Sequence, residues 1–66
     1  MYNIGDCIIF RNALGADLFG RIIRIWHKEQ NVPITYEVFC LGEVFLVGKE
    51  YIDKKISEEM YEQLMS

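Results

Sequence analysis

The sequence ITYEVFCLGEVFLV, residues 34–47, decides the fold class. In its first half, apolar residues such as Tyr36 and Val38 recur at every second position. Successive side chains of a strand point to opposite faces, so these two share one face and Phe39 lies on the other. β-branched and aromatic residues, which favour strands, dominate the stretch. We therefore predict a strand over residues 34–41.

A hairpin follows from the second half of the same stretch. Gly42 and Glu43 predict a tight turn, because glycine adopts a positive φ at little cost. The chain then returns along a strand at residues 44–47, in which Val44 and Leu46 share one face. Both faces of this strand are apolar, which is more than a small monomer usually leaves exposed. We expect the tail of the chain, a second copy or a target protein to cover the surplus.

Three further strands are predicted from short runs rich in Ile, Val, Phe and Tyr between glycines. They lie at residues 7–11, at 18–28 and around 51–52. Residues 12–17 have the composition of a loop and residues 29–33 that of a turn, because Asn, Asp, Gly and Pro suit turn geometry. The chain is therefore predicted to be an all-β domain of about five short strands.

The strand at 18–28 lacks a clean alternation. Gly20 is the natural place for a kink or for the close approach of another backbone. Arg21 and Arg24 are three residues apart, so they fall on opposite faces unless a β-bulge resets the register. The sequence leaves open which face of this strand is buried. The answer decides whether Arg21 or Arg24 is available for binding.

The only predicted helix lies at the end of the chain, over residues 57–65. Ser57 is a suitable N-cap, because its hydroxyl accepts a hydrogen bond from a free amide of the first turn. Ile56, Met60 and Leu64 recur at intervals of four and form an apolar stripe. So short a helix is stable only when packed, so we expect the stripe to lie against the open end of the β domain. A partner subunit is the alternative.

Length and composition indicate a single domain over residues 1–66, with the β portion at 4–52. The chain is 52% hydrophobic and 26% charged, which excludes disorder. No run of about 20 apolar residues is present and no secretion signal is visible, so we expect a cytoplasmic protein without a membrane anchor. Cys7 and Cys40 each lie in an apolar run and are expected to be buried thiols, with a disulfide as the alternative.

Several features recur in a fixed order along residues 4–52. They are Gly5-Asp6 before an apolar strand, Phe19-Gly20-Arg21-Ile22 with Ile25-Trp26 after it, Tyr36-Glu37-Val38, residues 44–47, and Tyr51-Ile52. This order resembles the SH3-like small barrels, which include Tudor domains, KOW modules and the plasmid-encoded type II dihydrofolate reductases. The resemblance implies a small five-stranded barrel closed by the C-terminal helix.

The resemblance to the reductases does not extend to their chemistry. Those enzymes line a pore shared by four subunits with a Val-Gln-Ile-Tyr strand, whereas residues 44–47 read VFLV and lack the glutamine and the tyrosine. His27 is the only histidine, and the chain holds too few Cys and His for a structural zinc site. No phosphate-binding glycine motif occurs. We therefore expect no enzyme activity, no cofactor and no metal.

Two sets of residues are candidates for binding. Arg21, Arg24, Trp26 and Lys28 interleave cations with an aromatic ring, as in binders of single-stranded nucleic acid. The net charge of −3 argues against general binding to a nucleic-acid backbone. The second set consists of apolar residues expected to point outward on the hairpin, Phe39 and Leu46. A cage for a methylated cation, built from Trp26, Tyr36, Phe39 and Tyr51, is a further reading.

We expect a non-catalytic module that binds a protein partner or a second copy of itself. By analogy, small proteins of this kind in phages and plasmids bind and modulate a host factor. A nucleic-acid-binding barrel is the first alternative. An oligomeric pore enzyme is the second.

Overall fold

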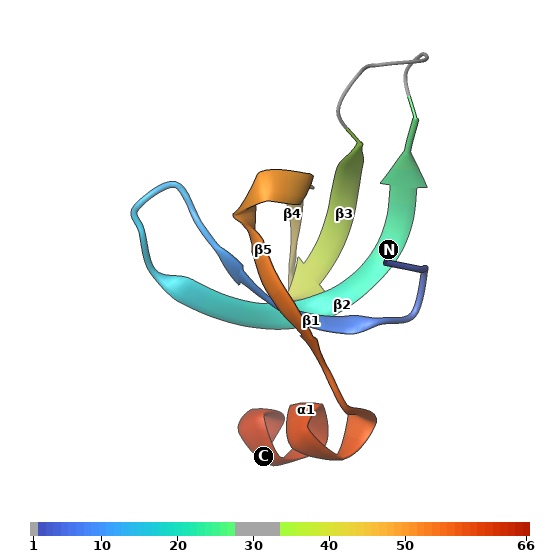
Figure 1. The fold of residues 1–66 in the computed structure, drawn as a ribbon. Helices are drawn as coiled ribbons and strands as arrows, with labels where there is room; N and C mark the ends of the chain where they lie inside the picture. Colours follow the sequence, from blue (N-terminus) through green and yellow to red (C-terminus); the bar gives the residue numbers. More distant parts are fainter. Residues whose placement is uncertain (1, 28–33) are drawn as a thin grey trace.

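The computed structural model describes residues 2–27 and 34–66 of the chain. Lys28 and the predicted turn at 29–33 lie outside the described residues. The chain forms five strands, a short 3-10 helix (η1) and a C-terminal helix, and Figure 1 shows how the strands and the C-terminal helix are arranged. Their bounds are β1 Cys7–Arg11, β2 Asp17–Trp26, β3 Thr35–Cys40, β4 Glu43–Gly48, η1 Lys49–Tyr51, β5 Ile52–Ile56 and α1 Glu58–Met65.

The strands form one antiparallel sheet in the order β4-β3-β2-β1-β5. The predicted all-β fold with a short C-terminal helix is therefore confirmed. β4 and β5 are the two edges of the sheet, and η1 connects them. Within residues 2–27 and 34–66 no ladder joins these two edges, so closure into a barrel stays a prediction.

β2 is the longest strand, and it bends so that its two halves belong to different parts of the sheet (Figure 1). Its first half pairs with β1 and its second half with β3. The backbone approaches β3 closely at Gly20, where a Cβ atom would lie 2.5 Å from the carbonyl oxygen of Phe39 and 2.7 Å from Cγ1 of Val38. The close approach predicted for this glycine is confirmed, and it allows the sheet to fold over one core.

A register shift between Ile22 and Arg24 follows the bend. Ile22 pairs with the core residue Val38, and Arg24 pairs with Glu37 on the other face. The extra residue of this bulge is Ile23. Arg24 consequently lies on the same face as Arg21, although the two are an odd number of positions apart.

The core lies on the concave side of the bent sheet and contains no buried charged side chain among the described residues. Both cysteines are buried and free, which agrees with the prediction of buried thiols. The hairpin alternation is also confirmed, since Tyr36 and Val38 are buried and Phe39 is exposed. The core cluster is Ile8, Phe10, Ile22, Tyr36, Val38, Cys40, Val47 and Ile52.

The hairpin turn lies one residue earlier than predicted. Its central residues are Leu41 and Gly42, with φ of 51° and 83°, and β4 already begins at Glu43. Two positive φ values in a two-residue loop define a type I′ turn, whose twist matches that of the flanking strands. The prediction places the turn at Gly42-Glu43 because glycine adopts a positive φ at little cost, and it misses Leu41, since leucine rarely adopts a positive φ.

The sheet extends beyond residue 52, where the prediction ended it. β5 continues through the charged residues 53–55 to Ile56, which is buried opposite Cys7. A run of three charges has the composition of a solvated loop, but on an edge strand such charges remain exposed to water. The 3-10 helix η1 was not predicted.

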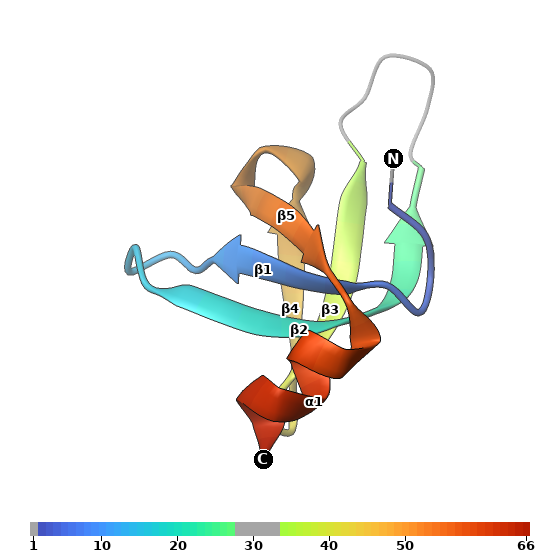
Figure 2. The same ribbon diagram turned by 60° about the horizontal axis from the view of Figure 1, so that its bottom comes forward.

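None of the described helices is long and apolar enough to span a membrane. α1 has eight residues, and the amide of Met60 donates to Oγ of Ser57 at 3.1 Å, which confirms the predicted N-cap. Of the predicted apolar stripe only Ile56 is buried, whereas the packing predicted for Met60 and Leu64 is wrong, because both stay exposed and no residue of α1 is buried. Figures 1 and 2 show that α1 follows β5, and in Figure 1 it lies below the sheet, where its first turn contacts Cys7 and Arg21.

Replacing Gly20 tests the close approach directly. We expect Gly20→Ala to cost about 3 kcal/mol, because the nearest atom is a backbone oxygen that cannot move aside. A domain of this size can lose little more than that. Urea unfolding followed by circular dichroism measures the change.

Gly15→Ala is the matched control, because its φ is +83° but nothing lies within 4 Å of the added carbon. We expect Gly15→Ala to lower the free energy of unfolding by about 1 kcal/mol, because only the left-handed backbone conformation disfavours the alanine. Equal costs for the two substitutions would contradict the role given to Gly20.

Candidate functional site

Five of the six residues singled out in the sequence share one face of the sheet. The ladders place Arg21, Phe39 and Val44 in one row across β2, β3 and β4, and Arg24, Glu37 and Leu46 in the next. Trp26 pairs with Thr35 in a third row. The sixth residue, Lys28, lies outside the described part of the chain. We call the outer face the set Arg21, Arg24, Trp26, Glu37, Phe39, Val44 and Leu46.

The β3–β4 side of the outer face is apolar and exposed. Phe39 and Val44 are direct cross-strand partners, and 44% and 52% of their surfaces are accessible. Leu46, two residues further along β4, is 73% accessible. Three neighbouring apolar side chains in water are the kind of patch that marks an interaction site.

The β2 side of the outer face carries cations that already have partners. The Arg24 guanidinium lies 4.1 Å from the centre of the Trp26 ring, in cation–π geometry. The indole N–H of Trp26 in turn donates a hydrogen bond to the Glu37 carboxylate. A cation, an aromatic ring and an anion therefore form one cluster. The negative charge of Glu37 offsets the positive charge of Arg24, which would otherwise attract the phosphate of a nucleic acid.

Arg21 is held by the C-terminal helix. It donates to Glu58 Oε1 at 2.7 Å and to the carbonyl oxygen of Gly5 at 2.9 Å. Its guanidinium also lies 5.1 Å from the centre of the Tyr61 ring. The hydrogen bond from Arg21 lowers the pKa of Glu58, so this ion pair is present at neutral pH and is lost as the pH falls through that lowered pKa. Arg21 therefore helps to attach α1 to the sheet.

Cys7 belongs to the same cluster. Its thiol donates to Glu58 Oε2 at 3.0 Å, and burial together with this hydrogen bond raises the pKa of Cys7 to about 11. A thiol with so high a pKa is almost fully protonated at neutral pH and is a poor nucleophile. Cys7 thus helps to position α1 and does not act as a reactive group.

The exposed side of α1 adds apolar surface near the C-terminus. Met60, Leu64 and Met65 are each more than 40% accessible. The helix is attached through its first turn, by the bonds to Glu58 and the contact of Tyr61 with Arg21. Polar contacts with β1 and β2, and not the apolar stripe, therefore hold α1.

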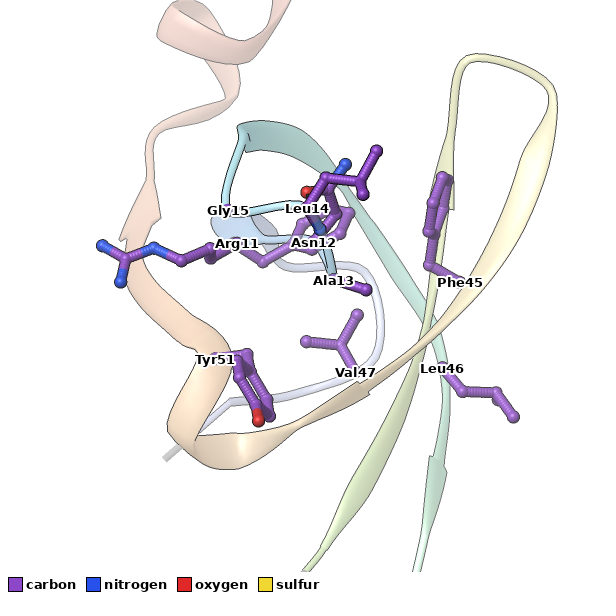
Figure 3. Close-up of a pocket in the computed structure, with 10 residues that line it drawn as sticks. Arg11, Asn12, Ala13, Leu14, Gly15, Phe45, Leu46, Val47 and Tyr51 are labelled. Carbon is purple, nitrogen blue, oxygen red and sulfur yellow. Dashed lines mark hydrogen bonds between the residues drawn. The ribbon is translucent and has the colours of Figure 1, made fainter.

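A cleft of about 660 Å³ lies on the other face of β4 (Figure 3). The loop after β1 forms one wall, where Asn12 Oδ1 accepts hydrogen bonds from the amides of Leu14 and Ala16. Figure 3 shows Val47 pointing into the cleft and Leu46 pointing away from it. The lining residues are Phe10, Arg11, Asn12, Ala13, Leu14, Gly15, Phe45, Leu46, Val47 and Tyr51.

The lining limits what the cleft can do. It contains no His, Cys, Ser, Asp or Glu, and the polar side chains in it are those of Arg11, Asn12 and Tyr51. Across residues 2–27 and 34–66, no three His, Cys, Asp or Glu side chains are clustered as metal ligands. The cleft is suited to hold an apolar group.

The aromatic cage is not assembled. Tyr36 is in the core and Tyr51 lines the cleft, whereas Trp26 and Phe39 are on the outer face. Sequence reasoning also missed Glu58 and the cleft. The contact between Cys7 and Glu58 spans 51 residues, and no local pattern signals such a pairing.

Comparison with known proteins gives no match to any family model, curated protein or solved structure.

The Cys7–Glu58 contact predicts a specific change in thiol reactivity. Glu58→Ala removes the hydrogen bond that raises the pKa of Cys7 and loosens the first turn of α1. We expect the alkylation of Cys7 by iodoacetamide at pH 8 to become about tenfold faster, the change given by one pKa unit. Peptide mapping by mass spectrometry separates Cys7 from Cys40.

Glu59→Ala is the matched control, since it removes the neighbouring carboxylate in the same exposed turn. Its alkylation rate should equal that of the unmodified chain. Equal rates for Glu58→Ala and Glu59→Ala would contradict the proposed attachment of α1.

Proposed function

We propose that the chain is a non-catalytic protein-binding module and that the outer face is its binding surface. The observation that carries this proposal is the exposure of Phe39, Val44 and Leu46 on one face beside a stacked tryptophan and arginine. Aromatic residues and arginine are enriched at protein interfaces and supply most of their binding energy. The mixed composition of the outer face fits that pattern.

The geometry of the outer face also suits a preorganised site. Phe39 and Val44 are on paired strands, so no backbone has to become ordered at these positions when a partner binds. The cluster of Arg24, Trp26 and Glu37 lies in the adjoining rows and can form the polar rim that excludes water from an apolar centre.

Binding to nucleic acid is less well supported. Arg21 is engaged by Glu58, and the Arg24–Trp26 stack lies beside the Glu37 carboxylate. Arg21 and Arg24 are therefore matched by two anions within the same region. A nucleic-acid surface instead needs cations in excess, and the chain carries a net charge of −3.

The proposal also includes an SH3-like barrel architecture and a protein partner in the cytoplasm. The bend of β2 and the sheet order β4-β3-β2-β1-β5 support the resemblance to SH3-like small barrels. A cytoplasmic partner protein, such as a host factor bound by a small phage- or plasmid-type protein, suits a domain that has an exposed apolar face.

Capture from a host lysate, followed by titration of the purified partner, tests the outer face. We expect Phe39→Ser and Leu46→Ser each to weaken binding by about tenfold or more, because apolar anchors at the centre of an interface dominate affinity. Binding should persist at high salt, since the contact is mainly apolar.

Leu14→Ser is the matched control, because Leu14 is 93% accessible but belongs to the cleft wall. It should bind as the unmodified chain does. Loss of binding in Leu14→Ser alone would move the site to the cleft. Tight binding of a single-stranded oligonucleotide that falls steeply with salt and weakens in Arg24→Ala would favour the nucleic-acid alternative.

A further inference from the structure

β4 is exposed along one edge as well as on its outer face, at Val44 and Leu46. The type I′ turn makes Cys40 and Glu43 a hydrogen-bonded pair, and such pairs alternate with non-hydrogen-bonded ones along an antiparallel ladder. Phe45 and Val47 therefore use their backbone groups to bind β3. The N–H and C=O groups of Val44 and Leu46 point to the free edge of the sheet.

No backbone hydrogen bond elsewhere in residues 2–27 and 34–66 satisfies these edge groups. Val44 and Leu46 also have exposed apolar side chains. A regular apolar edge strand with free backbone groups is a template for another strand.

The opposite edge of the sheet is protected. β5 has the sequence Ile-Asp-Lys-Lys-Ile, with three consecutive charges that stay exposed. Charged residues, lysine above all, are a common means of preventing strands from adding to an edge. β4, by contrast, has a single charged residue, Glu43, at its start. One edge of the sheet is closed to association and the other is open.

We infer that the β4 edge pairs with β4 of a second copy of this chain, in antiparallel orientation, to form a twofold dimer with one continuous sheet. The free groups of Val44 and Leu46 narrow the register, because only residues whose groups face the edge can form a hydrogen-bonded pair, which leaves the twofold axis at Val44, Phe45 or Leu46. Of these three registers, only the one with the axis at Leu46 sets Glu43 opposite Lys49. Val44 of each copy then lies opposite Gly48 of the other.

Charge complementarity selects this occupant and this orientation. With the axis at Leu46, Glu43 at the start of β4 in each copy comes next to Lys49 of the other, the first residue of η1 directly after β4. Parallel pairing would instead bring Glu43 close to Glu43, which is unfavourable. The chain is thus self-complementary in the antiparallel register, as a twofold interface requires.

The inference does not depend on the proposed function, because it rests on the free backbone groups of the β4 edge, although Val44 and Leu46 also contribute their side chains to the outer face. Pairing at the edge joins the two outer faces into one surface and brings the two Leu46 side chains together at the axis.

The mass in solution, measured by sedimentation from micromolar to millimolar concentration, tests the pairing. We expect the unmodified chain to pass from monomer to dimer over this range. Leu46→Lys should raise the dimer dissociation constant by about tenfold or more, because two like charges then meet at the axis. Phe39→Lys is the matched control, since it adds the same charge to the same face one strand away from the edge.

A charge exchange tests the register. E43K and K49E should each weaken the dimer by about tenfold, because each places like charges side by side at both ends. A mixture of the two variants should recover the affinity of the unmodified chain, since both end contacts then join opposite charges. Urea unfolding of each variant alone verifies that it is folded.

Three results would overturn the inference. They are a chain that stays monomeric at millimolar concentration, equal effects of Leu46→Lys and Phe39→Lys, and a mixture of E43K with K49E that associates no better than either variant alone. The first would leave the β4 edge to an extended segment of another protein. The second would place the contact between copies on the outer face.

Discussion

The close approach of the β2 backbone at Gly20 to the carbonyl oxygen of Phe39 is the constraint on which the remaining structure depends. It brings β3 against the point where β2 changes partner, and so lets one sheet of five short strands enclose a core. The bulge after Ile22 then resets the register, so that alternate residues of β2 again face the core. Arg21 shares the outer face with Arg24 and Trp26 because of this bulge.

The charged groups around the outer face have partners within the chain, whereas many apolar side chains remain exposed to water. Arg21 is bound by Glu58, and Arg24 stacks on Trp26 beside Glu37. Unpartnered apolar surface gathers instead around β4, on its outer face, in the cleft behind it and along its edge. A small domain that leaves so much apolar surface in water gains stability when a protein covers it.

Local patterns predicted the parts of the fold that are locally determined. The alternation around Val38, the hairpin and the capping by Ser57 each involve residues a few positions apart. The sequence also indicated that Arg21 and Arg24 could share a face only through a bulge, which is what the ladder contains. The outward positions of Phe39 and Leu46 followed from the same period of two.

Contacts between distant residues could not be predicted in this way. The apolar stripe on α1 suggested packing through Met60 and Leu64, whereas Glu58 attaches the helix to Cys7 and Arg21. The three charged residues 53–55 have the composition of a loop, so the sequence did not indicate that β5 continues to Ile56. An edge strand can be charged and still pair on one side. The cleft likewise arises from a loop and a strand far apart in the chain, so neither sequence alone signals it.

Hydrogen exchange of single amides along β4, followed by NMR at a low and a high protein concentration, tests the open edge most directly. At both concentrations the amides of Phe45 and Val47 should be protected by their bonds to β3. The amides of Val44 and Leu46 should exchange freely in the dilute sample and become protected in the concentrated one. Protection of all four amides in the dilute sample would contradict the account, because β4 would then already pair with another strand of its own chain.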